Sequence, residues 1–200
     1  MIENPILILD LGNVIFTIEN EGFNAWLNSC KTKNTPANFD SAFRDLYFYY
    51  ERGDFDCQSF MNQLKDELAL TFENEKFKEM WLSIWVKNNP GIEELVKDFK
   101  DRLPCYILSN TNAMHMDVYF ETKPILSEFR KVFLSYAMKC AKPEKEIYMK
   151  VIEELNCKPE QIIFFDDKEE NIESAKACGY NGVVFKDAFQ TRRDLEALLA

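Results

Sequence analysis

The segment ILILDLGNV at residues 6–14 decides how this chain folds. Four aliphatic residues lead directly into Asp10, and Gly12 follows two positions later. A short, unbroken apolar run is typical of a strand that is buried on both faces of a parallel sheet. Open α/β sheets bind their ligands at the carboxyl ends of such strands. The sequence therefore predicts that Asp10 lies at a binding site.

The second half of the chain alternates between helical and strand-like patterns. Helical spacing occurs at residues 92–99, 114–121, 143–155, 169–178 and 192–199, and strand-like runs at residues 105–108, 132–135, 162–165 and 182–185. Such alternation predicts a parallel sheet with helices on both faces.

Residues 20–85 differ from the rest, because aromatic and aliphatic side chains recur there at helical spacing and no strand signal is evident. A turn at residues 88–91 ends this block. We predict an α/β fold with a Rossmann-like, doubly wound parallel-sheet core at residues 1–16 and 88–200. A four-helix cap domain is expected to be inserted at residues 17–87.

Composition limits the partners of the chain. The 200 residues carry a formal net charge of −10, which argues against a nucleic-acid or anionic-membrane surface. No apolar run approaches the ~20 residues that span a bilayer, and residues 1–4 lack the basic start of a secretion signal. We therefore expect a cytoplasmic protein that binds a small molecule, as a monomer or weak homodimer. The six cysteines are scattered without metal-ligand spacing, and we expect free thiols.

Polar side chains follow three further strand-like runs. Asp166 and Asp167 come directly after residues 162–165, and adjacent carboxylates repel each other unless a cation lies among them. Magnesium prefers such hard oxygen ligands, and Asp10, Asp167 and a backbone carbonyl would suit it. As an alternative, Asp167 would simply cap the following helix.

Ser109 and Asn110 end another strand, where a hydroxyl and backbone N–H groups at a helix start can bind an anion. Lys142 precedes a later helix. Taken alone, these residues are as well explained by helix capping and by a solvated lysine. Their order along the chain predicts instead that the strand ends meet around one phosphate and one divalent metal.

The ordered set of segments resembles the haloacid dehalogenase-like hydrolase superfamily, in its phosphatase branch with a helical cap. The matching segments are residues 8–14, 108–112, 142–144 and 164–167, with 171–172 behind them and the Glu-Arg-Gly turn at 51–53. The similarity extends in particular to bacterial sugar-phosphate phosphatases of the α-glucose-1-phosphate type. It covers nearly the whole chain.

The resemblance implies a role for each residue. Asp10 would attack phosphorus and carry an aspartyl phosphate. Ser109 and the Asn110 amide would hold phosphate oxygens, and Lys142 would neutralise the charge that Asp10 shares with the phosphoryl group. Mg²⁺ would be bound by Asp10, Asp167 and the Gly12 carbonyl, with Asp166 orienting the metal shell. The expected activity is Mg²⁺-dependent hydrolysis of small phosphorylated metabolites, above all sugar phosphates.

Gly12 departs from the family pattern, because most phosphatases of the superfamily have a general acid–base aspartate at this position. An easy leaving group, such as the hemiacetal oxygen of an anomeric phosphate, would compensate in part, and Glu51 in the cap could supply a proton. Two other functions stay open: a 2-haloacid dehalogenase, whose family also lacks that aspartate, and a non-catalytic phosphometabolite-binding regulator.

Two further residues have uncertain roles in the sequence. Arg52 is expected, with Glu51, to bind substrate from the cap. His115 is the single histidine of the chain, and a packing role and a role beside the substrate are both open.

Overall fold

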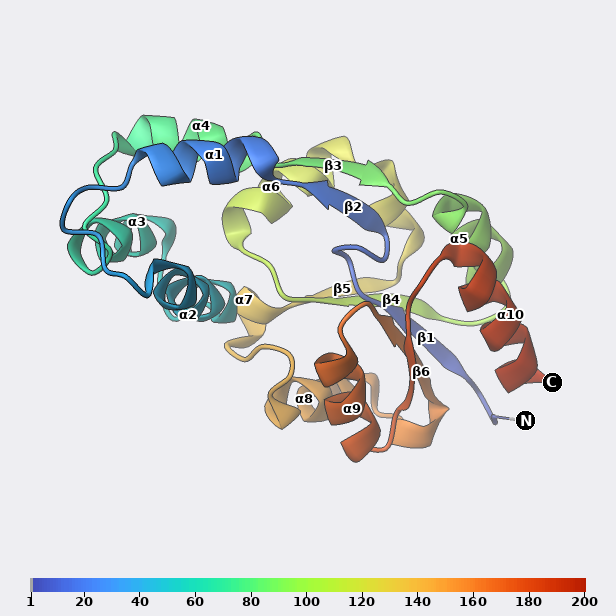
Figure 1. Cartoon of the computed structure of the whole chain (residues 1–200). Helices are drawn as coiled ribbons and strands as arrows, with labels where there is room; N and C mark the ends of the chain where they lie inside the picture. Colours follow the sequence, from blue (N-terminus) through green and yellow to red (C-terminus); the bar gives the residue numbers. More distant parts are fainter. Residues whose placement is uncertain (1) are drawn as a thin grey trace.

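The computed structural model describes residues 2–200, and within them five parallel strands form one sheet (Figure 1). The strand order is β5 (Lys131–Leu134), β4 (Cys105–Ser109), β1 (Ile6–Leu9), β6 (Ile162–Asp166) and β7 (Asn181–Val184). β1 lies at the centre and pairs with β4 on one side and β6 on the other. Asp10, Asn110 and Asp167 therefore follow three adjacent strands at one edge of the sheet.

Helices cover both faces of this sheet, because alternate residues of β1 point to opposite sides. Leu7 and Leu9 pack into one hydrophobic cluster, whereas Ile6 and Ile8 pack into another. The first cluster is completed by α5 (Ile92–Lys100), α6 (Ala113–Thr122) and α10 (Ala188–Leu199), and the second by α8 (Lys145–Leu155) and α9 (Glu169–Ala177). The predicted doubly wound α/β fold is confirmed.

Shorter elements complete the core: α7 (Ser135–Met138) after β5, and the 3₁₀ turns η1 (Pro124–Glu128) and η2 (Pro159–Gln161). Two helix starts differ from expectation. α8 begins at Lys145, not at Pro143, because residues 141–144 form a turn in which the Glu144 amide donates to the Ala141 carbonyl. α10 begins at Ala188, not at residue 192, because the Asp187 side chain caps the Gln190 amide.

Four helices between β1 and β4 form the predicted insertion, which we call the cap. They are α1 (Glu21–Ser29), α2 (Phe39–Arg52), α3 (Cys57–Asp66) and α4 (Asn74–Leu82). The cap has a hydrophobic core of its own, in which the rings of Phe60, Phe77 and Trp81 lie within 6.1 Å of one another. In Figure 1 the cap extends to one side of the sheet.

Two strands at the ends of the cap were not predicted from the sequence. β2 (Phe16–Glu19) and β3 (Trp85–Asn88) pair antiparallel, with Phe16 opposite Asn88, and connect the cap to the core. Four-residue strands are too short to show a clear period in sequence, and their pairing joins residues about seventy positions apart. The predicted boundaries at residues 16/17 and 87/88 fall within this strand pair.

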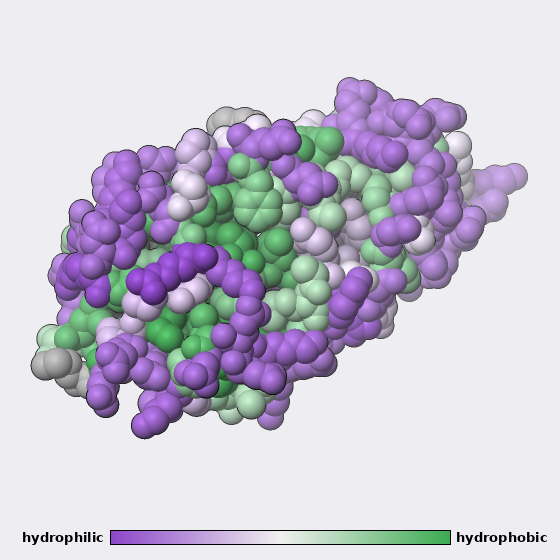
Figure 2. Space-filling model, turned by 180° about the vertical axis from the view of Figure 1, so that it is seen from behind, coloured by the Kyte–Doolittle hydropathy of each residue, from purple (hydrophilic) through white to green (hydrophobic). Residues whose placement is uncertain are grey.

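The surface opposite to the view of Figure 1 is mixed in character. Figure 2 shows hydrophobic side chains in the middle of this face and hydrophilic side chains along its edges. No described helix is both long and apolar enough to cross a membrane. The six cysteines are free thiols, as expected.

Candidate active site

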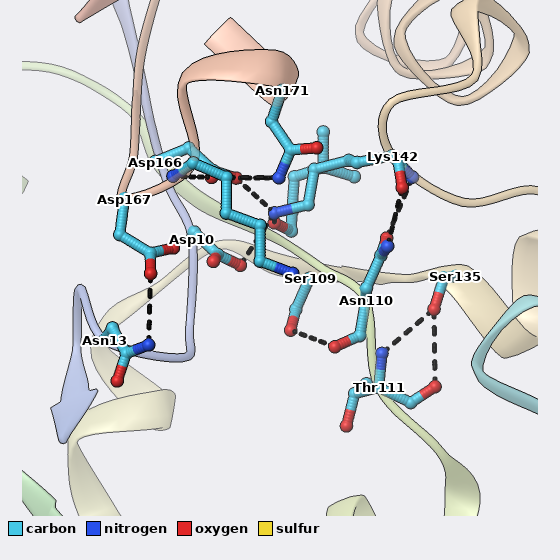
Figure 3. Close-up of polar contacts among 12 residues, drawn as sticks. Asp10, Asn13, Ser109, Asn110, Thr111, Ser135, Lys142, Asp166, Asp167 and Asn171 are labelled. Atoms are coloured by element: carbon cyan, nitrogen blue, oxygen red, sulfur yellow. Dashed lines mark hydrogen bonds and ion pairs between the residues drawn. The ribbon is translucent and has the colours of Figure 1, made fainter. Parts of the chain in front are cut away.

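The strand ends meet at Lys142, whose ammonium group links two carboxylates (Figure 3). Its Nζ lies 2.8 Å from Asp10 Oδ1 and 2.6 Å from Asp166 Oδ2, and it also donates to the Leu108 carbonyl at 2.9 Å. The lysine side chain is only 1% exposed. Because a buried ammonium group is stable only when it is paired, these three acceptors hold it in one position.

Asp166 has both oxygens occupied by donors of the protein. Asn171 Nδ2 donates to Oδ1 and Oδ2 at 2.9 and 3.0 Å, and the Lys168 amide donates to Oδ1 at 2.8 Å. Lys142 takes the remaining position on Oδ2. Asp166 therefore holds the Lys142 ammonium group and the Asn171 amide in place.

Asp167 is more open than Asp166 and points toward the first loop. Its Oδ2 accepts from Asn13 Nδ2 at 3.0 Å (Figure 3). Asp10, Asp166 and Asp167 each offer a carboxylate oxygen, and these oxygens lie within 4.8 Å of one another. Three carboxylates beside one lysine leave excess negative charge, and hard oxygen donors of this kind fit Mg²⁺.

The ionisation of Asp10 reflects the same crowding. Burial and the charge of Asp166 raise the pKa of Asp10 to about 7, although Lys142 acts in the opposite direction. The two carboxylates raise the pKa of Lys142, against the effect of its burial. A cation beside Asp10 would favour its charged form.

Ser109 and Asn110 lie at the end of β4, beside Asp10. Ser109 is buried, and its hydroxyl lies next to the Asn110 carbonyl at 3.3 Å. The Asn110 side chain joins the Lys142 loop through two hydrogen bonds: Nδ2 donates to the Lys142 carbonyl, and Oδ1 accepts from the Lys142 amide, at 2.8 and 2.9 Å. Asn110 thus positions the lysine, which leaves its backbone amide for a ligand.

Ser135, at the start of α7, is a site residue that sequence reasoning missed. Its Oγ accepts from the Thr111 amide at 3.0 Å (Figure 3). The same Oγ donates to the Glu51 carbonyl at 2.6 Å. It therefore ties the loop after β4 to the end of cap helix α2. Ser135 is the last residue of the run at 132–135 and carries no motif of its own. By contrast, Asn13 and Asn171 lie inside matched motifs and could have been named.

A cavity of about 270 Å³ lies over Asp10, between the core and the cap. Asp10, Gly12, Ser109, Asn110, Lys142 and Asp167 all line it, and Glu51 lines it from the cap. Burial raises the pKa of the Glu51 carboxyl, although a hydrogen bond from Tyr47 and the charges of Lys168 and Lys142 oppose the shift.

Arg52, which was expected to bind substrate together with Glu51, lies apart from these residues. It is not among the residues that line the cavity. Its guanidinium donates to Asp54 of the following turn and, at 2.9 Å, to Glu144 of the core. Arg52 follows Glu51 on α2, and residues one position apart on a helix point in different directions, so only Glu51 reaches the cavity.

His115 is buried between the core and the cap. Its ring stacks between Trp81 and Tyr119, with centroid distances of 5.3 and 5.6 Å. Nδ1 lies 3.2 Å from Asn112 Nδ2, and Nε2 lies 3.0 Å from the Trp81 carbonyl. This arrangement favours the packing role, because both ring nitrogens are used within the protein.

Fold and site together define a class of protein: a Rossmann-like α/β protein with an acidic centre at the carboxyl edge of its sheet and a helical cap over it. The family model of the haloacid dehalogenase-like hydrolases matches residues 6–179. The chain belongs to this family.

Two relatives of known name are similar to nearly the whole chain. The D-ribitol-5-phosphate phosphatase of Bacteroides thetaiotaomicron is 25% identical over 210 residues, covering 100% of this chain and 99% of its own length. The phosphorylated carbohydrates phosphatase of Thermotoga maritima is 26% identical over 176 residues, covering 86% and 81%. These names support the phosphatase branch that the sequence indicated. They do not support a particular similarity to an α-glucose-1-phosphate phosphatase.

The fold is also that of a solved structure. A haloacid dehalogenase-family enzyme of B. thetaiotaomicron, in complex with magnesium and inorganic phosphate, superposes with a TM-score of 0.78 at 24% identity. The match covers 92% of this chain and 96% of that one. The prediction of Mg²⁺ is confirmed to this extent: a family member of the same fold binds it, and the donor set of this chain fits it.

Proposed function

We propose that this chain hydrolyses small phosphomonoesters with Mg²⁺ as cofactor and Asp10 as nucleophile. The observation that carries the proposal is the position of Lys142, which pairs with Asp10 and Asp166 in a buried site that Asp167 and Ser109 also line. A carboxylate and a phosphate dianion repel each other, and this site concentrates the groups that remove the repulsion.

Each residue has a task in this reaction. Asp10 attacks phosphorus and forms an aspartyl phosphate, which water then hydrolyses. Lys142 holds the Asp10 carboxylate in place and balances charge on the phosphoryl group. The Ser109 hydroxyl and the Asn110 amide bind phosphoryl oxygens. Asp166 positions Lys142 through their 2.6 Å contact.

Asp10, Asp167 and the Gly12 carbonyl are the groups that would hold Mg²⁺, with Asp166 behind them. When bound, the ion offsets negative charge on the nucleophile and on the phosphoryl oxygens. Asn13, which donates to Asp167, keeps that carboxylate turned toward the site.

Proton transfer to the leaving group is the step with the least support from the protein, because Gly12 has no side chain. Glu51 is the carboxyl that the cap offers to the cavity, and its raised pKa keeps more of it protonated than an ordinary glutamate. We propose that Glu51 contacts the substrate and gives partial help with this proton, while an easy leaving group does the rest.

The relatives' names make phosphorylated carbohydrates one candidate substrate class. The dehalogenase alternative is less well supported, because a halide-releasing site has no use for the acidic pair Asp166 and Asp167. The binding-regulator alternative rests on Gly12 alone.

The test is hydrolysis of p-nitrophenyl phosphate by the purified protein with Mg²⁺ and with excess chelator. Its leaving group needs no proton, so Gly12 is no obstacle. We expect Mg²⁺-dependent phosphate release that Asp10→Asn abolishes. Phosphate release that survives in Asp10→Asn would reject the nucleophile. Chloride release from 2-chloropropionate would support the dehalogenase instead, and phosphate binding without turnover would support the regulator.

A further inference from the structure

The cavity over Asp10 has two chemically different halves. Its floor consists of the polar strand ends, whereas the side nearest the cap is lined mainly by hydrophobic side chains. Those that carry the argument are Ile18, Phe23, Phe43, Trp81, Ile84 and Val86. They come from β2, α1, α2, α4 and the chain through β3, so the apolar lining surrounds the space above the floor. A phosphoryl group bound at Asp10 places the organic part of the ester against this lining.

The cap half offers few polar side chains to a ligand, namely those of Asn20, Asn24, Tyr47 and Glu51, and they are partly engaged with one another. The Tyr47 hydroxyl donates to Glu51, and Asn24 Nδ2 donates to Asn20 Oδ1 at 3.1 Å. Asn20 and Asn24 are also exposed to solvent, at the rim of the cavity. A polyol would bring several hydroxyl groups into this half, and each hydroxyl left without a partner there would cost binding free energy.

His115 and its neighbours add aromatic surface, not hydrogen-bonding groups. Both nitrogens of the His115 ring are engaged, by Asn112 and by the Trp81 carbonyl. The rings of Trp81, His115 and Tyr119 lie nearly parallel, at interplanar angles of 5° and 3°. All three residues line the cavity. An aromatic group of the substrate would find ring faces and edges on this side.

The missing carboxyl at Gly12 is a second, independent observation. A leaving group that receives no full proton transfer must depart largely as its anion. A phenolic oxygen does so readily, since phenols have a pKa of about 10, as in tyrosine. The cavity volume of about 270 Å³ lies just below the ~300–1,000 Å³ of drug-sized pockets, which suits a single small ring.

We infer that this chain acts on phosphate monoesters of small aromatic hydroxyl compounds, in preference to phosphorylated carbohydrates. The inference rests on the proposed phosphatase function and names its substrate class. An Asp10 oxygen forms a bond to phosphorus while the bond from phosphorus to the aryl oxygen breaks, and the electron pair leaves on the phenolate. The phenolate takes its proton from water or Glu51. Water then cleaves the aspartyl phosphate, which restores Asp10 and releases inorganic phosphate.

Four substrates separate the polarity of the organic group from the ease of its departure. Phenyl phosphate is apolar with a weakly basic leaving group, and benzyl phosphate is apolar with an alkoxide. Glucose 1-phosphate is polar with a hemiacetal leaving group, and ribitol 5-phosphate is polar with an alkoxide. We expect phenyl phosphate to have the highest kcat/KM. For benzyl phosphate we expect a lower kcat/KM that comes mainly from a lower kcat. For the two carbohydrate phosphates we expect a lower kcat/KM that comes mainly from a higher KM.

A kcat/KM for either carbohydrate phosphate that equals or exceeds that for phenyl phosphate would overturn the inference and leave the phosphatase function intact. Failure of the phosphatase function itself looks different: none of the four esters would release phosphate in a manner that needs Mg²⁺ and Asp10. The two failures are therefore distinguishable in one set of assays.

Phe43→Ala tests the lining directly. Loss of this ring should raise KM for phenyl and benzyl phosphate at least about tenfold, the scale of a lost hydrophobic contact in a pocket. The KM for glucose 1-phosphate and the inhibition constant of inorganic phosphate should stay unchanged, because both depend on the floor. The matched control is Phe48→Ala, a phenylalanine on the same helix that does not line the cavity.

An equal rise in KM for all four esters would contradict the proposal that Phe43 binds the apolar group of the substrate. So would an unchanged KM for phenyl phosphate. Ile84→Thr supplies the same comparison if Phe43→Ala does not fold, since Ile84 follows α4 and lines the cavity from a different segment.

Discussion

Lys142 shows at the scale of one residue how the site depends on its charges. A buried ammonium group bridges Asp10 and Asp166, and no water is needed to satisfy it. Its removal would leave two carboxylates facing each other in a buried site. The residue thus supports the fold as well as the reaction.

Lys142→Met should therefore both abolish turnover and destabilise the protein. Removing one partner of a buried ion pair costs about 3–5 kcal/mol of unfolding free energy. Urea denaturation in the presence of chelator measures this cost without a compensating cation. Lys150→Met is the control, because Lys150 forms an exposed pair with Glu146 and should change the unfolding free energy far less. If both substitutions lowered the unfolding free energy equally, the buried pairs of Lys142 with Asp10 and Asp166 would stabilise the protein no more than an exposed ion pair does.

Gly12 offers a gain of function at the same scale. A Cβ atom at this position would meet only the end of the Ile18 side chain, at 2.9 Å. The Ile18 side chain is exposed, so it has room to move aside. Gly12→Asp should fold and add the missing acid–base group, worth up to ~10²–10⁴ in kcat on alkyl esters such as benzyl phosphate. Phenyl phosphate should gain much less.

Gly12→Asn provides the matched control, because it has the same shape and cannot transfer a proton. If the asparagine variant gained as much as the aspartate variant, the absent carboxyl would not be what limits alkyl esters in the natural chain.

At the scale of elements, α2 is the helix that brings the cap to the site. It ends at Arg52. Gly53, the next residue, has a left-handed backbone with φ +82°, and the chain turns there against the start of α7. Ser135 Oγ donates to the Glu51 carbonyl, and Lys139 donates to the Gly53 carbonyl. These hydrogen bonds anchor the last turn of α2 to the core and hold Glu51 at the cavity.

Gly53→Ala should loosen this anchor. The new Cβ would lie 2.3 Å from the Tyr136 carbonyl oxygen, and the left-handed backbone alone costs an alanine about 1–2 kcal/mol. We expect a lower unfolding free energy in urea and a raised KM. Gly22→Ala in α1 is the control, since a Cβ there meets nothing within 4 Å and should stabilise the helix by ~0.4–1 kcal/mol. Unchanged stability in Gly53→Ala would show that α2 is not held at this point.

Over the whole molecule, the stack of Trp81, His115 and Tyr119 joins the cap to the core and should make stability depend on pH. Burial lowers the pKa of His115 below its ordinary value of 6.5. The unfolded chain therefore binds a proton at a pH where the folded chain does not. The contribution of His115 to stability is complete above about pH 6.5 and is lost as pH falls through the lower pKa of the folded state.

Urea denaturation at about pH 7.5 and about pH 5.5 tests this, with the wild-type protein beside His115→Gln. The wild type should lose more unfolding free energy than the variant between these values, because only the wild type must bury a titrating ring. Parallel losses in the two proteins would assign the acid sensitivity to other groups.

Much of the architecture followed from local patterns. The run at residues 6–9, the helix–strand alternation and the aromatic helices of the cap each come from side chains that are neighbours in sequence, so their periods were readable. The pairing of β2 with β3 was not, because each strand is four residues long and its partner lies far away in the chain. The contacts of Ser135 and Arg52 were hidden for the same reason, since both join the cap to the core.

By itself the sequence determined the α/β class, the inserted helices and the order of acidic, hydroxyl and cationic residues at successive strand ends. A parallel sheet brings those ends to one edge whatever the rest of the chain does, so Asp10, Ser109 and Asp167 had to meet. Lys142 lies in the loop after α7, and its hydrogen bonds with Asn110 hold that loop at the same edge. Only the tertiary structure decided that Glu51 and not Arg52 faces the cavity, and that aromatic and aliphatic side chains line its upper half. The way the cap packs on the core sets both, because that packing brings together side chains from distant segments.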